Sequence, residues 1–131
     1  MTPADLKKII TSAISEQIGE YEYSNGHKSQ AIAVGNVPND VKVMGLEVII
    51  PNFPDVPKSN QCGDTYIHRE ERWQIELILH GSDRALFYTA IDRLLRCLPR
   101  AEGRDIPQKS PLNTLPRYLI TFRHSDGYER I

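Results

Sequence analysis

The sequence has few of the residues on which common chemical sites depend. It holds only two cysteines, Cys62 and Cys97, whose positions match neither a disulfide framework nor a zinc-binding spacing. A reducing, cytosolic setting is therefore the default expectation. No glycine-rich phosphate loop follows an expected strand, because the glycines lie singly at turns. We accordingly expect no bound cofactor.

Neither positive nor negative charge is in clear excess. The chain carries 16 basic and 17 acidic residues, for a net charge of −1. This balance argues against a dedicated DNA-binding module and gives no reason to expect an acidic membrane as partner. No apolar run is long enough for a membrane span, and the N-terminus lacks the pattern of a signal peptide. At 131 residues the chain fits one domain, 1–131, with one full hydrophobic core.

The best-patterned stretch runs from Glu70 to Leu98. Its first half alternates apolar and polar residues, with Ile78 as the one exception on the polar side, and this predicts a strand with one buried face. The apolar positions are Trp73, Ile75, Leu77 and Leu79. In the second half the apolar residues recur at steps of three and four, which predicts a helix capped by Ser82. The residues of that helical face are Ala85, Ile91, Leu94, Leu95 and Leu98.

The N-terminal part predicts a helix followed by a hairpin and a strand. Thr2 is the expected N-cap of a helix that ends near Gly19. Asn25-Gly26 predicts the turn of a hairpin whose returning strand is 31–34. In the following expected strand, 41–50, the apolar residues occupy odd positions at the start and even positions later. A bulge at Met44-Gly45 would add one residue and bring both halves onto the same face of the strand.

Two long connections and a last strand complete the chain. The segments 52–69 and 99–116 are rich in proline and polar residues and are expected to be loops available for contacts. Residues 117–123 alternate again and predict the last strand, followed by a frayed polar tail from His124. The element order predicts an α+β fold, with an antiparallel or mixed sheet of four to five strands and both helices on one face.

Catalytic and metal sites are weakly supported. The sharpest enzyme hypothesis uses Cys62 as nucleophile, His68 as base and Asp64 as orienting group, but these residues share a loop that offers no rigid support. His68 and His80 flank the Trp73 strand in no known metal-ligand spacing and are better read as surface residues. Glu70 and Glu71 are expected on opposite faces of their strand, which argues against paired acid and base chemistry. We expect a protein that is not an enzyme.

Interface residues are the more promising class. Phe53 lies among prolines, where it either anchors a partner or folds back over the core. A basic patch near the end of the second expected helix is a further candidate, formed by Arg96, Arg100, Arg104, Arg117 and Arg123. For Arg96 and Arg100, favourable charge at the helix C-terminus is the alternative. The candidate interface residues are Asn25, His27, Phe53, Asp55, Lys58, Arg69, Arg100, Arg104 and Lys109.

Taken in order, these segments resemble the tail terminator proteins of tailed bacteriophages, also called tail-completion or neck proteins. The resemblance covers nearly the whole chain and rests on element order and on local phrases of moderate specificity. These phrases are IGEYEYSNG, QAIAVGNVP, VMGLEVIIP, ERWQIELIL leading into SDRALFYTAIDRLLRCLP, and RYLITFRHS. No phrase is a catalytic fingerprint.

The resemblance implies a structural virion protein. Such proteins assemble into a homo-oligomeric ring, typically a hexamer, which caps the tail tube and joins it to neck or connector proteins, with DNA only passing through the lumen. It also implies localisation in the virion tail or neck, and in the host cytoplasm during assembly, with no membrane. Another head-tail connector, a tube-associated subunit and a small cytosolic binding module stay open as alternatives.

Overall fold

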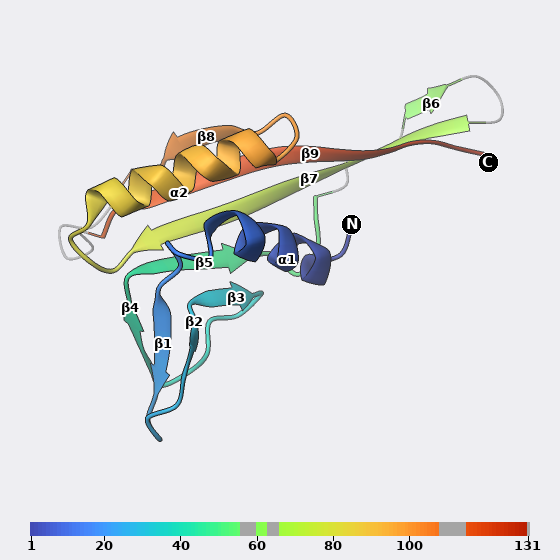
Figure 1. Ribbon diagram of the computed structural model, residues 1–131. Coiled ribbons are helices and arrows are strands. Elements are labelled where there is room, and N and C mark those ends of the chain that lie inside the picture. Colours follow the sequence, from blue (N-terminus) through green and yellow to red (C-terminus); the bar gives the residue numbers. More distant parts are fainter. Residues whose placement is uncertain (56–59, 63–65, 108–114, 131) are drawn as a thin grey trace.

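A computed structural model describes the backbone of residues 1–55, 60–62, 66–107 and 115–130, and the side chains of these residues except 60–62, 66–69 and 125–130. It contains two helices and two sheets (Figure 1). In chain order the elements are α1 (Pro3–Ile14), β1 (Glu20–Tyr23), β2 (Lys28–Gln30), β3 (Ile32–Val34), β4 (Val41–Met44), β5 (Leu46–Ile50), β6 (Asn60–Cys62), β7 (Tyr66–Leu79), α2 (Arg84–Cys97), β8 (Glu102–Asp105) and β9 (Arg117–Arg130).

The main sheet has the strand order β3-β5-β7-β9-β8, and β6 pairs with the outer part of β7. All its pairs are antiparallel except β3 with β5, which is parallel. Both helices pack on one face of this sheet (Figure 1). The predicted α+β fold, with a mixed sheet and two helices on one face, is confirmed.

The core lies between that face and the helices. Trp73 is completely buried and stacks on Phe122 of the neighbouring strand, with ring centroids 6.4 Å apart and planes inclined by 10°. The other predicted inward residues of β7 are also buried: Ile75, Leu77 and Leu79. Burial of this continuous apolar face is the main source of stability, because the free energy gained scales with the apolar area removed from water.

Both helices differ from their predicted limits. Helix α1 has the expected Thr2 cap, a capping box completed by Asp5, but it ends at Ile14 rather than near Gly19. Helix α2 is capped by Asp83, whose carboxylate accepts from the Leu86 N–H at 3.1 Å, so the prediction of Ser82 was wrong. A carboxylate caps as well as a hydroxyl, and the sequence offered both at adjacent positions.

Most of the predicted buried face of α2 is confirmed, since Ile91, Leu94 and Leu98 are buried and Leu95 packs partly buried against the core. Phe87 and Ala90 are buried together with Ile91 and Leu94, whereas Ala85 is exposed. Phe87 lies one turn before Ile91. The helical period was therefore predicted correctly, but the buried face begins at Phe87 rather than at Ala85.

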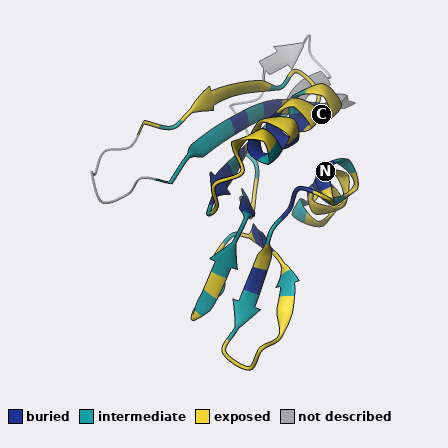
Figure 2. Ribbon diagram, turned by 60° about the vertical axis from the view of Figure 1, so that its left-hand side comes forward, coloured by how far each residue is buried: buried dark blue, intermediate teal, exposed yellow. Residues whose placement is uncertain are grey.

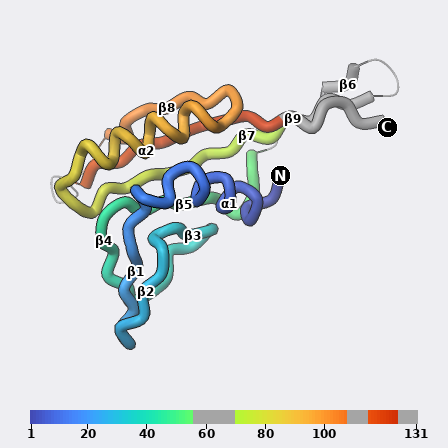
Figure 3. Tube along the Cα trace, in the orientation of Figure 1, coloured from blue at the N-terminus to red at the C-terminus, as the bar shows by residue number. Residues whose placement is uncertain are grey.

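A second, three-stranded sheet with the order β2-β1-β4 was not predicted. It extends away from the main sheet, and the Cα trace passes into it after α1 and returns through β4 (Figure 3). The hairpin partner of β1 is Lys28–Gln30, whereas the predicted returning segment 31–34 belongs mostly to the main sheet. Gly45 has φ of 80° and separates β4 from β5, so the expected bulge is a change of sheet.

Two predictions near the C-terminus were wrong. The connection 99–116 contains strand β8, which pairs with β9 through Glu102↔Thr121 to Asp105↔Tyr118. The tail from His124 was expected to fray, but β9 continues to Arg130 and pairs with β7 along its length. Strands β7 and β9 therefore run past the helices and form an arm with β6 (Figure 1).

Candidate interaction surfaces

A buried polar cluster joins the two sheets. The Glu47 side chain is almost fully buried, and its carboxylate accepts a hydrogen bond from the Tyr21 hydroxyl at 2.6 Å. The other carboxylate oxygen lies 2.8 Å from Nε2 of His80. A buried carboxylate without partners would strongly destabilise the fold, so this cluster fixes how the small sheet sits on the main one. His80, predicted as a scattered surface residue, is thus half-buried and partnered.

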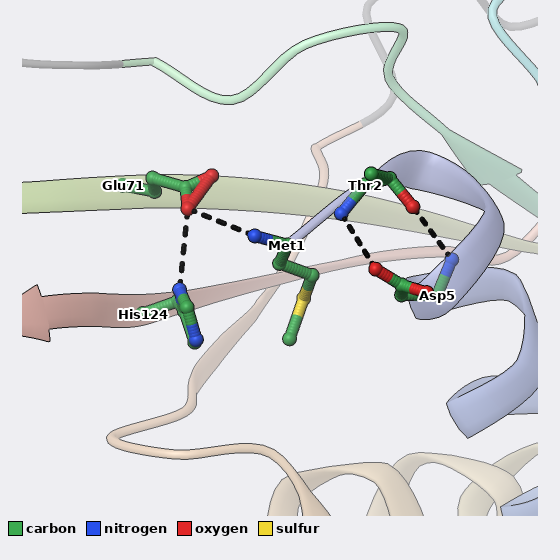
Figure 4. A network of polar contacts seen from close by, with 5 residues as sticks. All are labelled: Met1, Thr2, Asp5, Glu71 and His124. Carbon is green, nitrogen blue, oxygen red and sulfur yellow. Dashed lines mark hydrogen bonds and ion pairs between the residues drawn. The ribbon is translucent and has the colours of Figure 1, made fainter.

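A second polar cluster fixes the start of the chain (Figure 4). The Glu71 carboxylate lies 3.3 Å from the amino group of Met1 and 3.2 Å from Nδ1 of His124. Glu70 instead pairs with Arg123 at 3.3 Å on the other face of the sheet, as expected for adjacent strand residues. The two carboxylates have separate structural partners.

The outer face of the main sheet, on the side away from the helices, carries alternating charges. Arg117 pairs with Glu76 at 3.0 Å, and Arg123 pairs with Glu70. Arg96 pairs with Asp92 within α2 at 3.2 Å. The arginines that could have formed a basic patch are therefore divided between elements, and three of them are paired with carboxylates.

Strand β8 forms one edge of the main sheet. All four of its residues are exposed. Tyr118 lies over Gly103 so closely that an added Cβ would overlap its ring, and this aromatic cover compensates for the missing side chain. Glu102 and Arg104 form no ion pair with any residue that the structure describes.

Strand β3 forms the other edge, next to an apolar corner. We use this name for Val34, Val37 and Phe53, which are 36%, 38% and 78% exposed. Gly35 lies against the Asn52 side chain, and this contact brings the end of β3 close to the segment that carries Phe53. Phe53 is thus exposed and does not fold back over the core. Exposed apolar side chains on two neighbouring segments make this corner a candidate surface for a partner.

The other predicted interface residues are spread over the molecule. Asn25 and His27 are exposed at the hairpin tip, where the Asn25 side chain accepts from the His27 N–H at 2.9 Å. Asp55 is exposed and forms a backbone bridge with Arg72. Arg100 is exposed with φ of 50°, and Arg104 lies on β8.

Three further candidates fall partly or wholly outside the description. Lys58 and Lys109 lie outside the described residues, and of Arg69 only the backbone in β7 is described. The structure does not gather the remaining candidates into one site. It places them at a hairpin tip, an apolar corner and a sheet edge. Sequence reasoning missed β3 and β8 as edges, because only the pairing order reveals an edge.

Cys97 is the one cysteine whose side chain lies in the described part of the chain. Burial raises the pKa of the Cys97 thiol, which disfavours the reactive thiolate. The side chains of the Cys62, His68 and Asp64 hypothesis lie outside the described residues. Within the described part of the chain, no three metal-ligating side chains come together. Neither helix has the length and apolar content needed to cross a membrane, as far as the described residues reach.

Comparison with known proteins adds no family assignment. No protein-family model matches the chain, and searches of curated proteins and of solved structures found no significant match.

Proposed function

We propose that this protein is a structural assembly subunit of the phage tail terminator type, which forms a homo-oligomeric ring, caps a tail tube and joins it to the neck. A closed ring of identical subunits uses a head-to-tail contact, so each subunit presents two different surfaces. The proposal therefore depends on finding two unlike exposed regions on one domain.

The observation that carries the proposal is the pair of extensions beyond the packed core. The three-stranded sheet extends away from the body, and the arm of β6, β7 and β9 continues past the helices (Figure 1). The strand residues of β1 and β2 are partly or fully exposed apart from Tyr21. Extensions of this kind supply loops and strand edges to neighbours, a common mode of protein recognition.

The apolar corner is the surface that we assign to the neighbouring subunit. Phe53 exposes 78% of its surface, more than any other large apolar residue described. Aromatic side chains that fill a pocket on the partner carry a large share of binding free energy. The hairpin tip with Asn25 and His27 is the second surface, because it lies at the end of the extended sheet.

The proposal is tested by the mass and shape of the purified protein. Light scattering and negative-stain imaging are expected to find closed rings. The variant Phe53→Ser is expected to lose them, whereas Tyr88→Ser, which removes an aromatic residue 58% exposed on α2, is expected to keep them. A protein that forms no ring would favour the small binding module instead.

A further inference from the structure

We infer that strand β8 pairs with β8 of a second copy of this chain, in antiparallel orientation about a two-fold axis through Gly103. The contact goes beyond the ring proposed above and does not depend on it, because it uses a different edge and joins only two copies.

The backbone of β8 is in the right phase for this pairing. The Ile106 N–H donates to the Arg117 carbonyl at 3.1 Å, so Ile106 points its backbone groups toward β9. Hydrogen bonding alternates along an antiparallel strand, so the backbone groups of Glu102 and Arg104 also point toward β9. Gly103 and Asp105 therefore direct their N–H and C=O groups away from the sheet, where the strand order ends.

A two-fold axis at Gly103 uses these outward groups. Gly103 faces Gly103 of the second copy, and the two residues exchange both backbone hydrogen bonds, as in a hydrogen-bonded pair of an antiparallel sheet. Glu102 then lies opposite Arg104 of the second copy, and Arg104 opposite its Glu102. These are non-hydrogen-bonded positions, where facing side chains come closest.

The charges of β8 favour this register over its neighbours. With the axis at Gly103, the contact holds two pairs of opposite charge between side chains that have no ion pair within the described chain. The neighbouring antiparallel registers move the axis by one whole residue, because residues that face each other must share the same hydrogen-bonding phase. With the axis at Arg104 or at Glu102, that residue would face its own copy, and the two like charges would repel each other. The strand is thus complementary to itself in one antiparallel register.

Access to this edge is open in the described structure. All four residues of β8 are exposed and appear yellow in Figure 2. A shallow hollow of about 330 Å³ lies beside the strand, lined by Glu102, Gly103, Arg104, Leu119 and Thr121. Facing side chains of a second copy can therefore approach Glu102 and Arg104 without displacing a covering element of the described chain.

The test uses the full chain carrying Phe53→Ser, so that the proposed ring contact does not contribute to the mass. Sedimentation equilibrium at low salt is expected to find a pair of chains, each of 14.9 kDa. Adding Glu102→Arg or Arg104→Glu replaces both attractive pairs with like charges. For each variant alone, the dissociation constant of the pair is expected to rise at least about tenfold. The control Lys7→Glu, on the exposed side of α1, is expected to leave the pair unchanged.

Mixing the two variants gives the decisive result. In a mixed pair the residues at 102 and 104 of one chain are both arginine and those of the other are both glutamate, so both facing pairs regain opposite charge. We expect an equimolar mixture to form mixed pairs as tightly as the parent chain. A parent chain that stays monomeric, or single variants that pair as well as the parent, would overturn the inference, as would a mixture that fails to recover pairing.

Discussion

The hydroxyl of Tyr21 lies 2.6 Å from the carboxylate of Glu47, and this hydrogen bond connects the two sheets. Tyr21 belongs to the small sheet and Glu47 to β5 of the main one. Both side chains are almost completely buried. The small sheet is therefore held by a specific polar contact in addition to its small apolar cluster of Tyr21, Ala31 and Ala33.

Removing this hydrogen bond should destabilise the fold. In Tyr21→Phe the Glu47 carboxylate loses one partner while still buried, and the free energy of unfolding is expected to fall by about 1 to 3 kcal/mol. Tyr23→Phe is the matched control, because Tyr23 is on the same strand and its hydroxyl only accepts from Ser29 at 3.3 Å. Urea unfolding monitored by circular dichroism measures both. Equal effects of the two substitutions would contradict the account.

The same contact predicts a loss of stability at alkaline pH. Burial, followed by the hydrogen bond and the charge of Glu47, raises the pKa of Tyr21 above its ordinary value of 10.0. A pKa raised in the folded state contributes stability that is complete below the unfolded value and is lost as the pH rises beyond it. The free energy of unfolding should thus decline above about pH 10, the ordinary tyrosine value.

This decline should be shallower in Tyr21→Phe. Burial also raises the pKa of Tyr118, so part of the decline remains in the variant and the difference between the two proteins isolates Tyr21. Unfolding curves at several pH values between 8 and about 11 provide the measurement. Parallel curves for the two proteins would show that Tyr21 is not the responsible group.

Gly19 should tolerate no side chain. A Cβ at this position would overlap the Met44 carbonyl oxygen and lie 2.8 Å from the Leu46 backbone nitrogen, where the chain changes sheets. Since backbone cannot move aside as a side chain can, Gly19→Ala is expected to cost about 3 kcal/mol or more in thermal unfolding. Gly26→Ala is the control: its φ is 84°, but nothing lies within 4 Å of the added atom, so the cost should be about 1 kcal/mol.

Helix α2 should depend on Leu94 more than on its neighbour. Leu94 is fully buried, and Leu94→Ala is expected to lower the free energy of unfolding by about 2 to 5 kcal/mol. Leu95 is only partly buried against the same core, so Leu95→Ala should cost clearly less. Denaturant midpoints of the two variants test the order, and the reverse order would show that α2 packs through another face.

Segments with a regular apolar pattern were predictable from the sequence, because the pattern itself indicates which side chains are buried. The alternation correctly placed Trp73, Ile75, Leu77 and Leu79 in the core. The phase change at Gly45 was visible too, but a one-residue bulge and a change of sheet give the same alternation. Only the positive φ and the partners of β4 distinguish them.

Unpatterned strands were not predictable because their partners are distant in the sequence. Strand β8 reads Glu-Gly-Arg-Asp and has no apolar residue, so its pairing is determined by the edge that β9 offers. The tail beyond His124 pairs with β7 residues more than fifty positions earlier in the chain. Likewise, Glu47 lies within the predicted strand 41–50, and no local pattern indicates its contacts with Tyr21 and His80.

The most direct measurement of the central claim is the mass of the purified chain by light scattering, combined with negative-stain images of the same sample. The account predicts closed rings of identical subunits that disappear in Phe53→Ser and persist in Tyr88→Ser. A chain that remains a monomer, or stops at a pair of chains, at every concentration tested would contradict the ring and with it the proposed role in capping a tail tube.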